Sequence, residues 1–303
     1  MIPLISSMCR GPLGVCQLPR FWWKTLLRQA GLLDAEYPDC SRGLDIWLLD
    51  AIGLDRDQTL EHVRSNRPTY LDFEQWVLEQ KGGALDPYAV ARYNEAVARR
   101  VHVDPGKIVE TYEDIGWGYE QTAVSAVLLN CLQDWQLCHR RDLGGSPADA
   151  APGTGVALQP PVVPLISSID RGPLDVCQLP RTWLKVTLRA RGLLHPEYPD
   201  FSGGLDARVL EILGLEPDAT LDFLRQQLPD YLAFEAWVRD HGVLDQGRIT
   251  AWNRSVEERV HRDEIRERIA VTVGMPAAQA PVSALVLNHI EDWHLAHAVV
   301  TGG

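Results

Sequence analysis

Apolar residues recur at intervals of three and four positions along most of the chain, which is the spacing of helices with one buried face. Leu44, Leu48 and Ile52 fall on one such face, and Gly53 stands where it would end that helix. No stretch alternates strictly enough between apolar and polar residues to predict a β-strand. The pattern therefore predicts an all-α fold. In the first half, the expected helices cover residues 21–33, 44–52, 60–65, 69–80, 87–102 and 124–140.

The sequence also repeats itself over a long interval. A displacement of 161 positions brings residues 10–24, RGPLGVCQLPRFWWK, onto residues 171–185, RGPLDVCQLPRTWLK. The same displacement pairs GLLDAEYPD with GLLHPEYPD. After a slip of a few residues the match resumes, with VSAVLLN at 124–130 on VSALVLN at 282–288. A period of this length is typical of a duplicated domain rather than of short stacked repeats.

The duplication sets the expected domain organisation. The first copy occupies residues 1–143 and the second occupies residues 164–303. Residues 144–163 between them are rich in proline, glycine and alanine, which is typical of a linker. We therefore expect two homologous helical-bundle domains in tandem, related by a pseudo-twofold axis.

Several short motifs recur along the chain. In the first copy they are LPRxxxK at 18–24, EY at 36–37, LDxxxLxxxGLD at 44–55 and WV at 76–77. The second copy carries a WN motif in ITAWNRSV, where the first copy has RYNEAV with tyrosine in place of tryptophan. Together these motifs resemble a small bacterial helical family, domain of unknown function 5069. The resemblance covers most of the first hundred residues of each copy, and it implies a helical fold and a bacterial source with no activity attached.

Composition and charge limit the kinds of molecule that the protein is expected to bind. Apolar residues make up 46% of the chain and charged residues 23%, which is typical of a folded protein. A net charge of −12 disfavours binding to nucleic acid or to an anionic membrane. The apolar runs are too short to span a bilayer, and the N-terminus lacks the features of a signal peptide. A cytoplasmic location is expected.

A stripe of cations is common to both copies. Arg20, Lys24 and Arg28 lie at i, i+4 and i+8 of one predicted helix, and Arg181 and Lys185 occupy the matching positions of the second copy. Such a stripe near a helix N-terminus could bind the carboxylate, sulfate or phosphate of a substrate. The alternatives are a solvated face and intramolecular ion pairs with the many acidic residues.

Four carboxylates are the candidate catalytic bases. Glu74 lies at the edge of an apolar stripe, and Glu235 repeats it. Partial burial there would raise its pKa and suit acid–base chemistry, although a buried salt bridge to a shared arginine is the alternative. Asp45 and Asp206 lie in the first turn of a predicted helix, where a favourable interaction with the helix dipole would also explain them.

Two tyrosines complete the candidate substrate-binding residues. Tyr37 and Tyr198 each stand in an EYPD motif. Each could donate a hydrogen bond to a substrate oxygen, or could simply close a turn before the proline.

No cofactor or metal is expected. The sequence has no phosphate-binding glycine loop, dinucleotide fingerprint or nucleophile elbow. Glu291 and His294 have the spacing of a di-metal bundle motif, but the first copy has Gln133 and Gln136 at the matching positions. This mismatch argues against metal binding.

These residues lead to two hypotheses, and the sequence leaves open whether the protein is an enzyme. The first is a cofactor-free enzyme of secondary metabolism that carries out an elimination, isomerisation or intramolecular cyclisation on a small anionic substrate. The cations would bind the substrate and a carboxylate would accept the proton. The alternative is a non-catalytic helical binding or adaptor protein for a partner protein or small ligand. Convergence of the candidate residues in one enclosed cavity would favour the enzyme.

Overall fold

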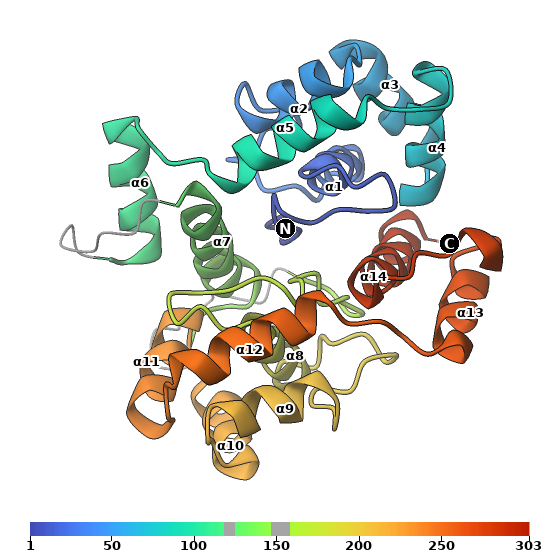
Figure 1. Cartoon of the computed structure of the whole chain (residues 1–303). Helices are drawn as coiled ribbons and strands as arrows, with labels where there is room; N and C mark the ends of the chain where they lie inside the picture. Colours follow the sequence, from blue (N-terminus) through green and yellow to red (C-terminus); the bar gives the residue numbers. More distant parts are fainter. Residues whose placement is uncertain (118–124, 147–157, 303) are drawn as a thin grey trace. The chain divides into compact units, whose positions relative to one another are not determined.

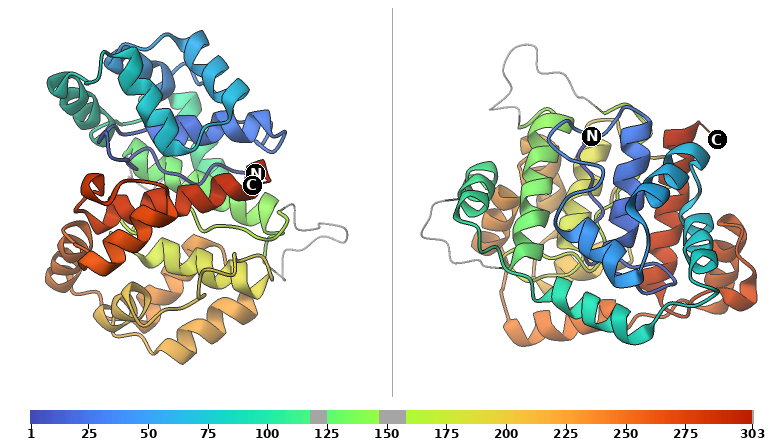
Figure 2. Two further views of the ribbon diagram at one scale, coloured as in Figure 1. Left: turned by 90° about the vertical axis from the view of Figure 1, so that its right-hand side faces the viewer. Right: turned by 90° about the horizontal axis from the view of Figure 1, so that it is seen from above.

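The computed structural model describes residues 1–117, 125–146 and 158–302. Within these residues the regular structure is helical, and the few β-bridges are isolated pairs outside any strand (Figures 1 and 2). The predicted all-α class is confirmed. The helices are α1 (Leu18–Gln29), α2 (Leu44–Ile52), α3 (Arg56–Asn66), α4 (Tyr70–Gln80), α5 (Pro87–Ala98), α6 (Pro105–Ile115), α7 (Ala126–Leu137), α8 (Leu179–Ala190), α9 (Leu205–Ile212), α10 (Pro217–Gln227), α11 (Tyr231–His241), α12 (Gln246–Glu257), α13 (Asp263–Thr272) and α14 (Ala284–Thr301).

Side-chain caps fix where many of these helices begin. The carboxylates of Asp55 and Asp86 accept hydrogen bonds from backbone N–H groups in the first turns of α3 and α5. The hydroxyl of Thr69 does the same for α4. These side chains satisfy donors that the helix itself leaves unpaired, so helix starts are encoded locally in the sequence.

The helix boundaries differ from the sequence prediction at several places. Helix α1 begins at Leu18, earlier than predicted, because proline fits its first turn, and it ends at Gln29 rather than at residue 33. Helix α3 begins at Arg56 rather than at residue 60. Helix α5 ends at Ala98 rather than at residue 102, and the chain then pairs Val101 with Ser125 in an isolated β-bridge. Helix α6 was not predicted. The start of the last predicted helix of the first half, at residue 124, lies outside the described residues.

The chain divides into two compact units, and each is built around one nearly fully buried helix. The α1 unit contains Ile2–Val101, Ser125–Val127 and Val260–Gly303. Its helix α1 packs against α2, α3 and α4, and α14 packs against α4 and α13. The α8 unit contains Met1 and the described residues of His102–Val124 and Leu128–Arg259. Its helix α8 packs against α9, α10 and α11.

The compact units are composed differently from the copies recognised in the sequence. Helices α13 and α14, from the end of the chain, belong to the unit built around α1. Helix α6 and most of α7, from the first half of the chain, belong to the unit built around α8.

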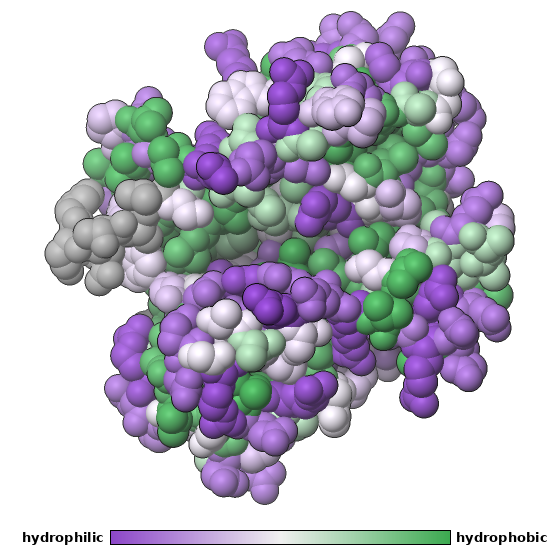
Figure 3. Space-filling model, in the orientation of Figure 1, coloured by the Kyte–Doolittle hydropathy of each residue, from purple (hydrophilic) through white to green (hydrophobic). Residues whose placement is uncertain are grey.

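Hydrophilic residues cover much of the face drawn in Figure 3, with smaller groups of exposed hydrophobic residues between them. Trp47 is the exposed tryptophan, with 49% of its surface accessible. Among the described residues, none of the helices has both the length and the hydrophobicity needed to cross a membrane.

Candidate functional site

A buried ion pair joins α1 to α2. The Nζ atom of Lys24 lies 2.5 Å from Oδ2 of Asp45, and both side chains are almost completely shielded from solvent. The same Asp45 oxygen accepts a hydrogen bond from the backbone N–H of Ser41 at 2.7 Å, and Oδ1 accepts one from Nε2 of Gln17 at 2.7 Å. Lys24 also donates to the carbonyl of Pro38 at 3.2 Å. The pair therefore fastens the loop before α2 onto α1.

The second half of the chain forms the same pair with more donors. Nζ of Lys185 lies 2.6 Å from Oδ2 of Asp206. Asp206 also accepts from Gln178 and Thr182 through Oδ1, and from both the backbone N–H and the hydroxyl of Ser202 through Oδ2. Asp206 thus has more hydrogen-bond donors around it than Asp45.

The electrostatics of these aspartates favour the ionised form. Burial alone would raise the pKa of Asp45, but the charge and hydrogen bond of Lys24 hold that pKa below its usual value. Asp206 has a lowered pKa for the same reasons, with Lys185 as the counter-charge. A carboxylate that is ionised, paired and saturated with donors is a poor acceptor for a substrate proton.

Arg20 donates hydrogen bonds to backbone carbonyls near the start of the sequence. Its Nη1 atom donates to the carbonyl oxygens of Pro3 and Ile5, at 2.5 and 2.8 Å. Its guanidinium carbon lies 6.0 Å from the ring centroid of Tyr37, a cation–π contact. Arg28 donates to the Tyr37 carbonyl oxygen at 2.5 Å. The arginines of the stripe therefore hold the N-terminal segment and the EYPD turn in place.

The second copy of the stripe makes matching contacts. Nη1 of Arg181 donates to the carbonyls of Pro164 and Ile166, at 2.7 and 2.8 Å. Its guanidinium carbon lies 5.9 Å from the ring centroid of Tyr198. Arg189 donates to the Tyr198 carbonyl at 2.7 Å. The cationic positions are thus used in the same way in both halves.

Glu74 is buried at a different place, where α4 meets the loop that precedes α1. Oε1 accepts a hydrogen bond from the hydroxyl of Tyr70 at 2.7 Å, and both carboxylate oxygens lie near the backbone N–H of Leu13, at 3.2 and 3.3 Å. Gly11 passes so close that an added Cβ would stand 2.3 Å from the Tyr70 ring and 2.5 Å from Glu74 Oε1. The carboxylate is therefore the anchor of this loop.

Glu235 repeats this arrangement. It accepts from the Tyr231 hydroxyl at 2.6 Å and from the backbone N–H of Leu174, and a Cβ added at Gly172 would stand 2.3 Å from Glu235 Oε1. Burial raises the pKa of both Glu74 and Glu235 to about 7. The expected rise of pKa at Glu74 is confirmed in direction, but the partner is a tyrosine and a backbone N–H rather than an arginine.

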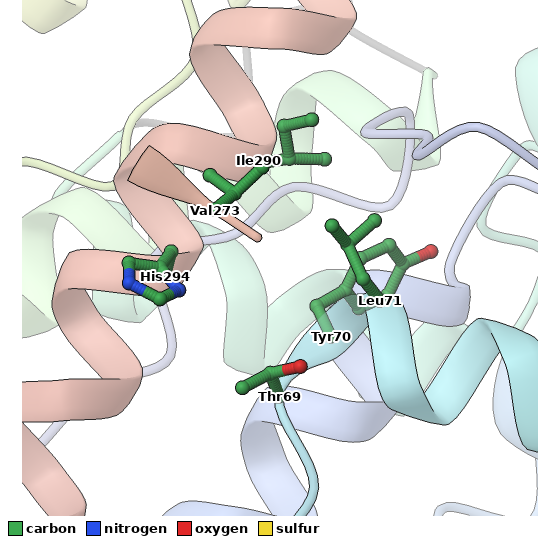
Figure 4. Close-up of a pocket in the computed structure, with 6 residues that line it drawn as sticks. All are labelled: Thr69, Tyr70, Leu71, Val273, Ile290 and His294. Carbon is green, nitrogen blue, oxygen red and sulfur yellow. The ribbon is translucent and has the colours of Figure 1, made fainter. Parts of the chain in front are cut away.

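A small pocket lies beside the N-terminus of α4. Figure 4 shows the ring of Tyr70 at its edge, with its hydroxyl pointing away from His294. The Tyr70 hydroxyl, and with it Glu74, is therefore directed away from this pocket. None of the ten predicted site residues lines it. The lining residues are Thr69, Tyr70, Leu71, Val273, Ile290 and His294.

The structure brings the predicted residues together only in part. Lys24 and Asp45 form one pair, and Arg20 and Tyr37 form another. Glu74 is bonded to different residues from those that bond to Lys24 and Asp45. Each of these side chains is engaged by the protein itself.

Two pairs of residues that hold this region were not singled out as site candidates. Gln17 and Gln178 adopt positive φ values of 66° and 74°, and their amide nitrogens donate to the buried aspartates. Within the described residues, their Oε1 atoms are buried without a hydrogen-bond partner. Asn94 and Asn253 accept from the backbone N–H of the cysteine before each glutamine. In the sequence, the repeated CQLPR run and the WN motif were the features that could have pointed to these residues.

Metal ligands do not cluster in the part of the chain that the structure describes: no group of three or more His, Cys, Asp or Glu side chains could hold an ion there. No protein-family model matches the chain, no curated protein matches its sequence, and no solved structure matches its fold.

Proposed function

We propose that this protein is a non-catalytic helical binding protein whose partner is another protein. The observation that supports this proposal most directly is the use of the repeated charged residues. Lys24, Asp45 and Glu74 are buried, and each bonds to a loop of its own unit. Asp206 and Glu235 do the same in the second half of the chain. Because these groups are occupied by the protein itself, we look for the recognition surface elsewhere.

The exposed aromatic residues of α2 and α5 are the best candidates for that surface. Trp47 on α2 is half exposed, and the guanidinium of Arg100 lies over its ring at 5.7 Å from the centroid. Tyr88 on α5 is 81% exposed. Tryptophan, tyrosine and arginine are the residues that most often dominate binding energy at protein interfaces. Of the other tryptophans, six are buried, and Trp76, Trp117 and Trp237 are less exposed than Trp47.

We further infer that the two halves descend from one duplicated helical bundle. The support is the matching of contacts at corresponding positions, as at Lys24 with Asp45 and Lys185 with Asp206. The pseudo-twofold relation of the halves and the resemblance to domain of unknown function 5069 belong to the same proposal. A bacterial source and a cytoplasmic location stay predictions from the sequence.

The enzyme hypothesis stays a prediction. It requires a carboxylate placed to accept a proton and cations placed to hold an anion. The lowered pKa of Asp45 and the bonding of Arg20 to the Pro3 and Ile5 carbonyls give it no support. Glu74 has a suitable pKa of about 7, but its hydrogen-bonded tyrosine is directed away from the nearby pocket.

The binding proposal is tested with tagged protein and two matched alanine variants. W47A removes the exposed aromatic ring, and V271A removes an exposed apolar side chain, 79% accessible, on α13. A specific partner should be retained by the wild type and V271A, and its affinity should fall at least about tenfold with W47A. A partner that binds all three equally contradicts the assigned surface.

A second measurement asks whether the protein has the anion site that the enzyme hypothesis requires. The melting temperature is followed while sulfate, phosphate and citrate are added to the wild type and to R20Q. The binding proposal expects no anion-specific rise in melting temperature. A rise seen with the wild type and lost in R20Q would reveal an anion site and would favour the enzyme hypothesis.

A further inference from the structure

The core of the α1 unit contains an aromatic cluster from three helices. The ring centroid of Trp22 on α1 lies 5.3 Å from that of Tyr70 on α4, with the rings edge to face. Tyr70 in turn lies 4.6 Å from Trp293 on α14, again edge to face. Trp22 and Trp293 are both fully buried. The last helix of the chain therefore supplies one side of a cluster whose other two members lie within the first 70 residues.

The α8 unit contains the same cluster with the origins reversed. Trp183 on α8 lies 5.6 Å from Tyr231 on α11, and Tyr231 lies 4.7 Å from Trp135 on α7. Here the first two residues come from the second half of the chain. The third comes from the first half.

Trp293 and Trp135, which each come from the other half of the chain, are both followed four positions later by a histidine. His297 stacks on Trp22 at 6.2 Å between centroids, and its Nε2 lies 2.8 Å from the carbonyl oxygen of Arg67. His139 packs on Trp183 at 6.3 Å, and its Nε2 lies 2.9 Å from the carbonyl oxygen of Leu228. Both carbonyls belong to the residue in left-handed conformation that ends α3 or α10.

These contacts correspond to one another position by position. The interval of 158 residues that separates Asn130 from Asn288 in the matched VSAVLLN and VSALVLN runs also separates Trp135 from Trp293, and His139 from His297. Each tryptophan–histidine pair therefore stands at the same place in its own half of the sequence. Each completes the core built by the other half.

We infer that the two halves of the chain exchange their C-terminal helices, so that the natural partner of each half is the other half. The exchanged surface carries Trp293 and His297 on α14, and Trp135 on α7 with His139 just beyond the end of that helix. It packs against the tryptophan of α1 or α8 and the tyrosine of α4 or α11. This inference does not depend on the proposed binding function.

Two short segments, residues 99–104 and 258–262, connect the helices of each half to the helices that it contributes to the other unit. Val101 in the first segment pairs with Ser125, and Val260 in the second pairs with Ser283, in isolated antiparallel bridges. The crossing therefore has the same local structure in both halves of the chain.

A histidine in each connecting segment contacts the last helix of the same half, α7 or α14. Nε2 of His102 lies 3.0 Å from Oδ1 of Asn130 on α7, and Nε2 of His261 lies 2.7 Å from Oδ1 of Asn288 on α14. Each connecting segment is therefore bonded to the helix that it carries into the other unit. Both histidines lie beyond the end of the preceding helix.

Because each half supplies part of the other's core, covalent continuity is not needed to keep the halves together. The first test inserts a specific protease site between Ala150 and Ala151 of the full-length chain. The folded protein is cleaved and then examined by size-exclusion chromatography. The two fragments should elute together at the size of the uncut protein and separate only in denaturant. Fragments that separate under native conditions would overturn the inference.

A second test distinguishes exchanged helices from an ordinary contact between halves. Leucine replaces Tyr70, Trp293 and Trp135 singly and in pairs, and the equilibrium constant for unfolding is measured for each variant. Exchange predicts that Y70L and W293L are non-additive by more than about fivefold, since these rings touch. It predicts that the effects of Y70L and W135L on this equilibrium constant are additive to within about twofold.

The reverse pattern, with coupling between Tyr70 and Trp135 of the same half, would overturn the inference even if the cleaved fragments stay together. Tyr231 provides the matched control, since it should couple with Trp135 and not with Trp293. If a leucine variant does not fold, separation of the cleaved fragments would still overturn the inference, because the cleavage test leaves every residue of the two aromatic clusters unchanged.

Discussion

Replacing Lys24 by methionine keeps most of the side-chain volume but removes the ammonium group that neutralises Asp45. Asp45 has no exposed surface, so it cannot recover the lost partner from water. It would keep only the hydrogen bonds from Gln17 and from the backbone of Ser41. Removal of one member of a buried ion pair costs about 3–5 kcal/mol of unfolding free energy because the other charge is left uncompensated. K24M should lose stability in this range.

The second half of the chain supplies a matched comparison. In K185M the carboxylate of Asp206 would still accept hydrogen bonds from Gln178, from Thr182 and twice from Ser202. Each hydrogen bond to a charged group contributes about 1.5–3 kcal/mol. K185M should therefore be less destabilised than K24M, by about 1–3 kcal/mol.

Urea denaturation at pH 7, followed by far-ultraviolet circular dichroism and by tryptophan fluorescence, measures both losses. K107M is the control for removing a lysine charge at the surface, since the pair of Lys107 with Glu110 is solvent-exposed at both ends. It should change the unfolding free energy by no more than about 1 kcal/mol. Where two transitions are resolved, each variant is compared within the transition of its own unit.

The pH dependence provides an internal check. The folded-state pKa of Asp45 is lowered, so the ion pair contributes stability above the unfolded pKa and loses it as the pH falls through the folded value. Without Lys24, burial dominates and that pKa rises. The deficit of K24M should therefore shrink towards acid pH, where a protonated Asp45 carries no charge. A deficit below about 1 kcal/mol at pH 7, or a greater loss in K185M, would refute this reasoning.

Two further variants test the loop anchored by Glu74. G11A should lose several kcal/mol of unfolding free energy in urea denaturation, because its Cβ would lie 2.3 Å from Tyr70. G203A is the control: its Cβ would enter open space, so it should be neutral or stabilised by about 0.4–1 kcal/mol. The pKa of Glu74 is raised to about 7 in the folded state, so its protonated form is favoured by folding and wild-type stability falls as the pH rises from about 4.5 to about 7. The unfolding free energy of E74Q relative to the wild type should therefore rise by about 3 kcal/mol over this range, and a difference that stays flat would show that Glu74 does not titrate there.

Local signals were enough to predict much of the helical structure. The bounds of α2 and α4 follow closely from apolar residues at helical spacing, from Gly53 after α2 and from Thr69 before α4. The end of α5 could not be read in this way. No glycine or proline occurs among residues 99–104, and the helix stops because Val101 pairs with Ser125, a residue distant in the sequence.

The candidate site was found by repetition, but its role depended on contacts that the sequence does not contain. The stripe of Arg20, Lys24 and Arg28 has the spacing of a solvated helix face, and intramolecular ion pairs were one of the alternatives left open. Lys24 is buried because the loop before α2 folds over it and brings Asp45 within bonding distance. Nothing in the spacing of residues along α1 encodes the position of that loop.

The exchange of helices is harder still to predict, because both arrangements satisfy one hydrophobic pattern. Trp135 and Trp293 have equivalent surroundings in the sequence, so each could fill the cluster of its own half or that of the other half with the same gain from burial. Local propensity and apolar spacing cannot separate these two states, since the same apolar positions would face a cluster in both. The contacts made by the residues that connect α5 to α6 and α12 to α13 belong to the exchanged arrangement alone. His102 lies within bonding distance of Asn130 on α7 and His261 of Asn288 on α14, so the topology of the chain depends on two short segments that carry almost none of its core.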